Sequence, residues 1–213
     1  MILRETDVAT PHTADTCSRT HGYSLKFHVN GDAAVQVALN ALESVELERG
    51  TLRQRYVFDH VVLVSPDDYA RMHRLNVVAS VQPAHALVGQ YGDQADHWGD
   101  ERTAHSWNFA AFPEQNIPLA IGTDWPVWPT PDALVNYWTS VNGTDGRALD
   151  RATAMAGYTE IGALAVGAEQ ELGRIAAGYH ADFVILSDNP LTSDNVSDIT
   201  VEETWVAGVP VYR

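Results

Sequence analysis

One arrangement, a short strand followed directly by a helix, repeats along the sequence and constrains its fold more than any other feature. The first copy is SLKFHVNGDAAVQVALNALE, residues 24–43, where an alternating apolar run ends at a histidine and a helical pattern follows, with Asp32 as its expected cap. The helix is expected to carry an apolar stripe spaced four and three residues apart, formed by Val35, Leu39, Leu42 and Val45. Further strands are predicted at 55–63, 76–81 and 117–122. Strands that alternate with helices favour a parallel sheet, with right-handed crossovers that carry every helix to one outer face. The sequence therefore predicts an α/β fold of about four βα units.

The C-terminal end of the chain has a different pattern, because short strands with glycine turns replace the strand and helix plan. The segments LGRIAAGYHADFVILSDNP and ITVEETWVAGVPVYR predict strands, and the last of these is expected to be a hairpin about Ala207 and Gly208. We therefore expect a (β/α) domain at 1–170 and a small β appendage at 171–213.

Charge and cysteine content exclude several functional classes. The chain has 28 acidic and 13 basic residues, so its net charge is −15, which repels nucleic acid and anionic membranes. Cys17 is the single cysteine, which excludes an intrachain disulfide and a cysteine-cluster metal site. No apolar run approaches the ~18 residues of a membrane span, and the first residues are too polar for a signal peptide. We therefore expect a cytoplasmic protein that binds no nucleic acid and no membrane.

Candidate metal ligands stand at the carboxyl ends of three predicted strands. His28, His60 and Asp124 each close a strand, and the carboxyl ends of parallel strands converge on one face. A single histidine at a strand end is more often structural, but three equivalent positions favour a shared site. Two imidazoles and a carboxylate suit zinc, iron or manganese, and a catalytic site keeps a coordination position open for water. The sequence thus predicts a divalent metal site, with zinc as the first candidate.

Six blocks of the sequence resemble, in order, the second half of the amidohydrolase superfamily, in its amidohydrolase-3 (YtcJ-like) branch. They are HVNGDAAV, DHVVLVSPDDYARM, VVASVQPAH, GDERTAHSWNF, IPLAIGTDWPV, and the C-terminal block from LGRIAAGYHADFVILSDNPL to VEETWVAGVPVY. The resemblance implies the C-terminal half of a TIM-type (β/α)8 barrel with a small β-sandwich appendage. It matches His28 and His60 to the histidines that end the fifth and sixth strands, and Asp124 to the aspartate that ends the eighth.

The resemblance also implies a reaction, the hydrolysis of a non-peptide carbon–nitrogen bond in a small-molecule substrate by metal-activated water. Asp124 would hold the metal and accept the proton of the attacking water. The resemblance places Gln82 and His85, in the QPAH segment, near the substrate, although a turn residue and a surface histidine are the simpler interpretations. Trp125 follows Asp124 and is expected either to border the substrate site or to brace the Asp124 loop.

The sequence departs from the family pattern in two respects. It contains no HxH pair among its nine histidines, and its only lysine, Lys26, lies in the strand that ends at His28. In the family, the HxH pair lies on the first strand of the barrel and a metal-binding lysine often lies on the fourth. Strands one to four of that barrel have no counterpart in this sequence. We therefore expect either a C-terminal part that needs a separate N-terminal half or a homo-oligomer, or a non-catalytic remnant.

Overall fold

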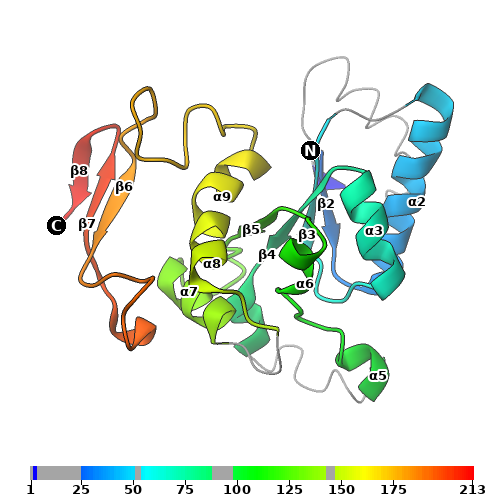
Figure 1. Cartoon of the computed structure of the whole chain (residues 1–213), viewed down its shortest axis with the longest axis horizontal. Helices are drawn as coiled ribbons and strands as arrows, with labels where there is room; N and C mark the ends of the chain where they lie inside the picture. The colour runs from blue at the N-terminus through cyan, green and yellow to red at the C-terminus, as the bar shows by residue number, and fades with distance from the viewer. Residues whose placement is uncertain (1, 4–24, 51–53, 88–97, 143–146) are drawn as a thin grey trace.

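The computed structural model describes most of the chain, namely residues 2–3, 25–50, 54–87, 98–142 and 147–213. Within these residues the chain forms a parallel sheet, helices that flank it, and a separate antiparallel sheet (Figure 1). Cys17 lies outside the described residues. No helix in the described ranges combines the length and apolar character needed to cross a membrane.

The parallel sheet contains the four predicted strands and one additional short strand, in the order β1-β2-β3-β4-β5. Its strands are β1 Ile2–Leu3, β2 Leu25–Val29, β3 Tyr56–His60, β4 Val77–Val81 and β5 Leu119–Ile121. The parallel sheet predicted from the βα plan is therefore confirmed. The register sets His28 beside Asp59 and Asp59 beside Ser80, so these polar side chains form a row on one face of the sheet.

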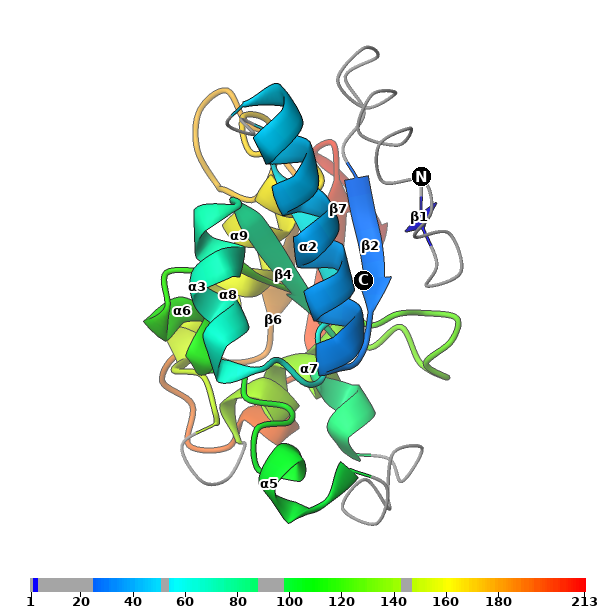
Figure 2. The ribbon, with the colours of Figure 1, turned by 90° about the vertical axis from the view of Figure 1, so that its right-hand side faces the viewer.

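Helices follow the strands as the sequence pattern indicates. In the described residues they are α2 Asp32–Arg49, α3 Pro66–Arg74, α5 Asp100–Thr103, α6 Ala111–Glu114, α7 Ala133–Val141, α8 Arg151–Tyr158 and α9 Glu160–Ala165, with 3-10 turns η2 Pro83–Leu87 and η4 Val196–Asp198. Figures 1 and 2 show α2 and α3 side by side against the β2–β4 part of the sheet. Because the strands are parallel, their carboxyl ends lie together at one edge of the sheet.

The first face of the sheet packs against α2 and α3. Phe27 and Phe58 project from this face, with their ring centroids 5.4 Å apart, and they belong to one buried cluster with Leu39 and Leu42 of α2. The apolar stripe predicted for this helix is therefore confirmed. The expectation that Asp32 caps α2 is wrong, because the N-cap is Gly31 and Asp32 is the first helical residue.

The opposite face packs against α9, so the expectation that every helix lies on one outer face is wrong. Val57, Val78 and Ala120 alternate with the residues of the first face, and they contact three side chains of α9. Those side chains are Ile161, Leu164 and Ala165. The crossover rule applies to helices that join two parallel strands, whereas α9 follows the last strand of the sheet and is free to cover its other side.

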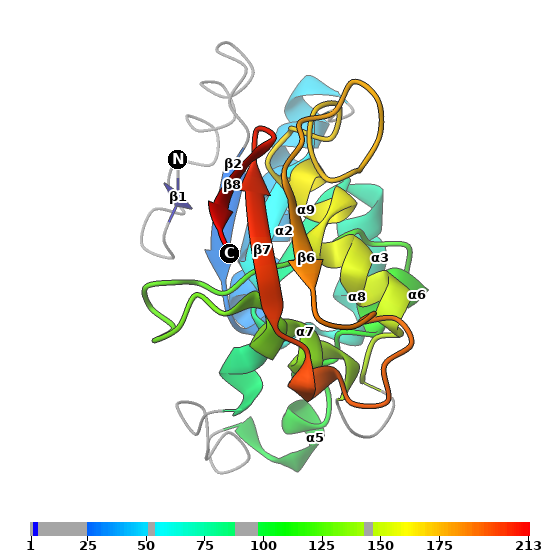
Figure 3. The same cartoon turned by 90° about the vertical axis from the view of Figure 1, so that its left-hand side faces the viewer.

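The antiparallel sheet has the order β6-β7-β8; it faces the viewer in Figure 3, and Figure 1 shows it apart from the parallel sheet. Its strands are β6 Phe183–Leu186, β7 Val201–Val206 and β8 Val209–Tyr212. The turn between β7 and β8 contains Ala207 at φ 51° and Gly208 at φ 75°, two successive left-handed residues that match the twist of a tight hairpin. The predicted hairpin is confirmed, while the partial barrel, the β-sandwich and the domain boundary at residue 170 stay predictions.

Candidate metal centre

Three side chains from three successive strand ends meet at the carboxyl edge of the parallel sheet. His60 ends β3, His85 lies in η2 directly after β4, and Asp124 follows β5. One ligand atom from each lies within 4.8 Å of the other two, and Nε2 of His85 is 3.9 Å from Oδ2 of Asp124. Both imidazoles are buried, whereas the Asp124 side chain is 26% exposed. This set, which we call the His60 cluster, thus joins two buried nitrogen donors to a carboxylate that solvent can reach.

The backbone is strained at two of these positions. His60 has φ 75°, Val61 has φ 40° and Asp124 has φ 59°, all in the left-handed region that non-glycine residues rarely adopt. The amide of Val61 donates to the carbonyl of Val29 at 2.9 Å, and the carbonyl of Asp124 accepts from the amide of Val127 at 2.8 Å. Each such residue costs on the order of 1–3 kcal/mol, a cost that surrounding contacts offset most often at functional sites.

The ring of His60 is held by neighbouring polar side chains. Its Nδ1 lies 2.8 Å from Oε1 of Gln82, whose Nε2 donates to Oδ1 of Asp59 at 3.0 Å. The same Asp59 oxygen accepts from the hydroxyl of Ser80 at 2.7 Å, and its other oxygen pairs with Lys26 at 3.1 Å. These bonds occupy Nδ1 of His60, whereas its Nε2 contacts His28 and lies 3.8 Å from Oδ2 of Asp59.

His28, the third predicted ligand, contacts the His60 cluster through His60. The two rings are 4.3 Å apart at their centroids, and Nδ1 of His28 lies 3.0 Å from Nε2 of His60. On its other side, Nε2 of His28 lies 3.2 Å from Nδ2 of Asn30. Metal ligation by His28 stays a prediction, because the mutually close set consists of His60, His85 and Asp124.

His85 is the residue whose part in this site the sequence indicated least clearly. Its side chain is buried, with the Trp128 ring 5.3 Å from its own, and its Nε2 has no hydrogen-bond partner among the described residues. Burial lowers the pKa of His85, against the opposing attraction of the Asp124 carboxylate. The ring is therefore biased toward the neutral form, which is the form that binds a metal.

The His60 cluster fits a divalent metal ion. Nε2 of His85 is buried and has no hydrogen-bond partner among the described residues, which costs free energy unless a ligand binds it. The nearby Asp124 carboxylate, at 3.9 Å, is too distant for a direct hydrogen bond. Two histidines and one carboxylate make a three-ligand set of the kind that catalytic zinc sites use, with a fourth position for water. The same donors also suit iron or manganese.

The other two predicted substrate residues have contrasting environments. Gln82 is 4% exposed, and both ends of its amide contact protein partners. Trp125 is 62% exposed and directly follows Asp124 in the chain. Asp59 was not among the residues singled out from the sequence, although its place one residue before His60 on the polar face of the sheet is the signal that identifies it.

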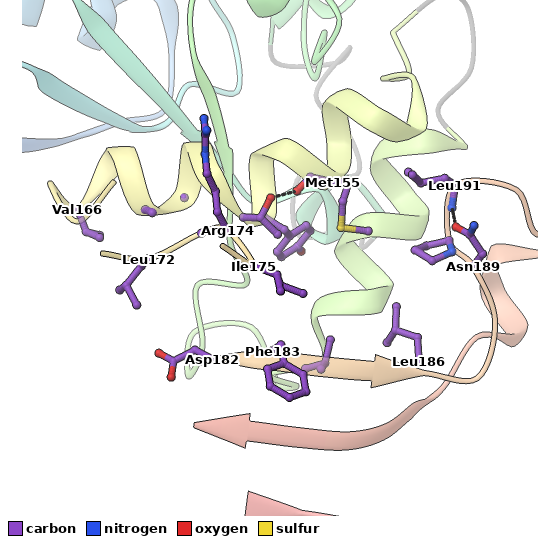
Figure 4. Close-up of a pocket in the computed structure, with 17 residues that line it drawn as sticks. Met155, Val166, Leu172, Arg174, Ile175, Asp182, Phe183, Leu186, Asn189 and Leu191 are labelled. Atoms are coloured by element: carbon purple, nitrogen blue, oxygen red, sulfur yellow. Dashed lines mark hydrogen bonds between the residues drawn. The ribbon is translucent and has the colours of Figure 1, made fainter. Parts of the chain in front are cut away.

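A pocket of about 650 Å³ lies away from the His60 cluster, between α8, α9 and β6 (Figure 4). Its wall is mainly apolar and includes Met155, Ile175, Phe183 and Leu186. None of the cluster residues lines it. The candidate chemistry and this pocket are therefore separate features of the molecule.

The fold and the cluster define an α/β protein with a candidate metal centre at the carboxyl edge of a parallel sheet. The sequence model that defines the amidohydrolase family matches residues 16–212. The chain therefore belongs to the amidohydrolase family, in its amidohydrolase-3 (YtcJ-like) branch. This finding confirms the resemblance noted in the sequence.

Three relatives illustrate the relationship. The chain is 31% identical over 207 residues to Protein LONG AFTER FAR-RED 3 of Arabidopsis thaliana, a match that covers 90% of this chain and 34% of that protein. It is 26% identical to "Putative amidohydrolase YtcJ" of Bacillus subtilis, over 92% of this chain and 39% of the relative. An uncharacterized metal-dependent hydrolase from Pyrococcus furiosus superposes with a TM-score of 0.75 at 27% identity, over 89% of this chain and 38% of that one. The chain thus spans between a third and two fifths of the length of these relatives.

Proposed function

We propose that this chain supplies part of the catalytic centre of a metal-dependent hydrolase that cleaves a carbon–nitrogen bond other than a peptide bond. The observation that carries the proposal is the approach of His60, His85 and Asp124 to within 4.8 Å at their ligand atoms. Zinc is the first candidate for the metal, because borderline nitrogen donors and a carboxylate are its usual ligands in catalytic sites. The substrate is a small molecule with a carbonyl or related carbon bonded to nitrogen.

The residues of the chain have distinct parts in this proposal. When bound, a divalent cation supplies Lewis acidity, which activates water and polarises a carbonyl oxygen. Asp124 is placed to accept a proton at Oδ2, because it is the cluster member that solvent reaches. His60 and His85 hold their nitrogens at fixed positions, since both rings are buried. Trp125 directly follows Asp124 in the chain, and its exposed side chain would contact substrate.

Other ligands and the rest of the pocket would come from a second segment or chain. Lys26 is 43% exposed and His28 is exposed, although both lie on the same polar face of the sheet as Asp59. In a closed barrel such positions face the interior, where side chains from other strands cover them. We therefore propose a partial barrel completed by an N-terminal half or by a second copy of the chain.

A non-catalytic subunit is the second candidate. Val127 is 68% exposed next to the exposed Trp125, so an apolar surface adjoins Asp124. Such a surface suits contact with another protein as well as contact with a substrate. In this case the cluster would bind metal without turnover.

Zinc binding is the first test. Equilibrium dialysis against zinc with elemental analysis would compare the wild type with His60→Ala and His85→Ala. His73→Ala is the control, because His73 is an exposed histidine of α3 that bonds the carbonyl of Asn116 at 3.0 Å. We expect one zinc in the wild type and the control, and loss of at least tenfold in affinity in both cluster variants.

A second step separates the two candidate functions. The zinc-loaded chain, alone and mixed with an N-terminal half from an amidohydrolase relative, would be assayed against a panel of N-acylated amines and cyclic amides. Hydrolysis that is abolished by Asp124→Asn supports the catalytic function. Tight zinc binding without turnover, both in the chain alone and in the mixture, supports the non-catalytic subunit. Zinc binding no stronger than that of His60→Ala would overturn both.

A further inference from the structure

The polar side chains around His60 form a chain of hydrogen bonds that ends at a carboxylate. Oδ1 of Asp59 accepts a hydrogen bond from Nε2 of Gln82 at 3.0 Å, and Oε1 of Gln82 lies 2.8 Å from Nδ1 of His60. These are short distances between buried or nearly buried groups, since Gln82 is 4% exposed, His60 6% and the side chain of Asp59 15%. Water therefore has little access to replace any of these partners.

Elementary donor and acceptor rules assign a direction to each bond. An ionised carboxylate only accepts, so the nitrogen of the Gln82 amide must face Asp59 and its oxygen must face His60. The amide oxygen also only accepts, so Nδ1 of His60 must carry the proton. A neutral imidazole has one N–H, so Nε2 of His60 carries a lone pair, which faces Nδ1 of His28 at 3.0 Å in the metal-free chain.

We propose that Asp59 is a positioning residue that, through Gln82, sets the tautomer of His60 and thereby leaves Nε2 as the atom that binds metal. The inference rests on the proposed metal centre for its function, but the tautomer itself is a property of the metal-free chain. It gives Gln82 a different part from the substrate contact expected from the sequence, because both ends of its amide are already bonded to protein.

The contacts of His28 agree with this direction. Nδ1 of His28 lies 3.0 Å from Nε2 of His60, so with a lone pair on His60 the proton of this bond belongs to His28. Nε2 of His28 then accepts from Nδ2 of Asn30 at 3.2 Å. All these bonds can therefore be satisfied at once with the proton of His60 on Nδ1.

The other contacts of Asp59 are longer or less directional than its bond with Gln82. Its Oδ2 lies 3.8 Å from Nε2 of His60, which is too far for a hydrogen bond. Its ion pair with Lys26 joins a side chain that is 43% exposed, and pairs of this kind contribute little. Ser80 donates its hydroxyl at 2.7 Å, but a hydroxyl can rotate to another acceptor. The rigid amide of Gln82 is the partner whose orientation depends on the charge of Asp59.

A pair of near-isosteric substitutions tests the inference. Asp59→Asn presents both an N–H and an oxygen, so it no longer dictates which end of Gln82 faces His60. In the double variant Asp59→Asn with Gln82→Glu, the new carboxylate can only accept, so it again requires the proton on Nδ1 of His60. The double variant also has the same net charge as the wild type. Asp68→Asn, at a buried aspartate of α3 that pairs with Arg71, is the matched control.

The readout is the tautomer of His60 in the metal-free chain, from long-range proton–nitrogen correlation spectra of protein labelled with nitrogen-15 histidine. The pH would be above the ordinary imidazole range, and the spectrum of His60→Gln would assign the signals. We expect a single Nδ1–H tautomer in the wild type, the Asp68→Asn control and the double variant, and a mixture of tautomers in Asp59→Asn. Zinc affinity should fall on the order of tenfold in Asp59→Asn and recover in the double variant.

Several results would overturn the inference. One is an unchanged Nδ1–H tautomer in Asp59→Asn, and another is a mixture that the double variant fails to restore, because a merely structural role predicts no rescue. A zinc affinity that does not follow the tautomer overturns the link to the metal. Absence of zinc binding in every variant, with the tautomer responding as expected, overturns the proposed function and supports the positioning role of Asp59.

Discussion

Nε2 of the buried His85 lies 3.9 Å from Oδ2 of Asp124, although the two residues are 39 positions apart in the chain. The separation is too long for a hydrogen bond, yet it is close to the spacing of two ligands that share one ion with bonds of about 2 Å. A buried nitrogen with no partner in the described part of the chain, next to a strained carboxylate residue, is the structural basis for the metal centre proposed here.

Asp124→Asn should weaken metal binding without destabilising the fold. Asparagine tolerates the left-handed backbone that Asp124 adopts at φ 59°, so we expect the thermal unfolding midpoint to change little. Zinc affinity should fall on the order of 10- to 100-fold, because a neutral amide is a poorer ligand than a carboxylate. Titration calorimetry with zinc measures this change, with the exposed Asp67→Asn as control. Equal affinity in both variants would contradict a ligand role for Asp124.

Trp125→Ala tests the predicted substrate contact. The side chain is 62% exposed, so its removal should alter the free energy of unfolding by no more than about 0.5 kcal/mol. Zinc affinity should also stay unchanged, whereas KM for a hydrolysed substrate should rise severalfold. Steady-state kinetics beside urea unfolding measures the two quantities, and an unchanged KM would leave Trp125 as a brace for its loop only.

Glu43 should make stability depend on acid pH. Arg71 of α3 bonds the carboxylate of Glu43 of α2 at 2.6 and 2.9 Å, and these hydrogen bonds lower the pKa of Glu43 below 4.5. The folded state thus favours the ionised form, and this stabilisation is present above the unfolded pKa and is lost as pH falls through the folded value.

Glu43→Gln should therefore cost about 1 kcal/mol of unfolding free energy at neutral pH. The difference from the wild type should shrink as the pH falls below about 4.5, because the unfolded-state carboxyl is protonated first and the folded-state carboxyl only at lower pH. Urea unfolding at a series of pH values tests this, with Glu114→Gln at an exposed position as control. A difference that does not vary with pH would show that packing, and not charge, is responsible.

Gly157→Ala should be destabilising although it lies inside α8. An added Cβ would lie 2.9 Å from Cγ1 of Ile121 and 3.0 Å from the carbonyl oxygen of Leu119, both in β5. Overpacking of this kind costs about 1–3 kcal/mol, which exceeds the gain of up to about 1 kcal/mol that alanine brings to a helix. Urea unfolding would measure the change, with Gly122→Ala, where the added carbon meets open space, as control. A stabilised Gly157→Ala variant would mean that α8 packs less closely on β5.

Much of the fold could be predicted because it depends on local pattern. The alternation of apolar residues marks β2, and the spacing of four and three marks α2, since each pattern follows from the geometry of one element. The hairpin at Ala207 and Gly208 was predictable for the same reason. The position of α9 was not, because no rule of chain connection restricts a helix that follows the last strand.

The candidate site was likewise predictable from the sequence only in part. The sequence by itself determined that His60 and Asp124 end strands of one parallel sheet, because strand ends in such a sheet share an edge, and family membership followed from the order of the motifs. Only the tertiary structure decided that His85 approaches Asp124 and that Gln82 bridges Asp59 and His60. The physical reason is that a side chain's partners depend on strand register and on the direction of a turn, which are set by packing between elements distant in sequence.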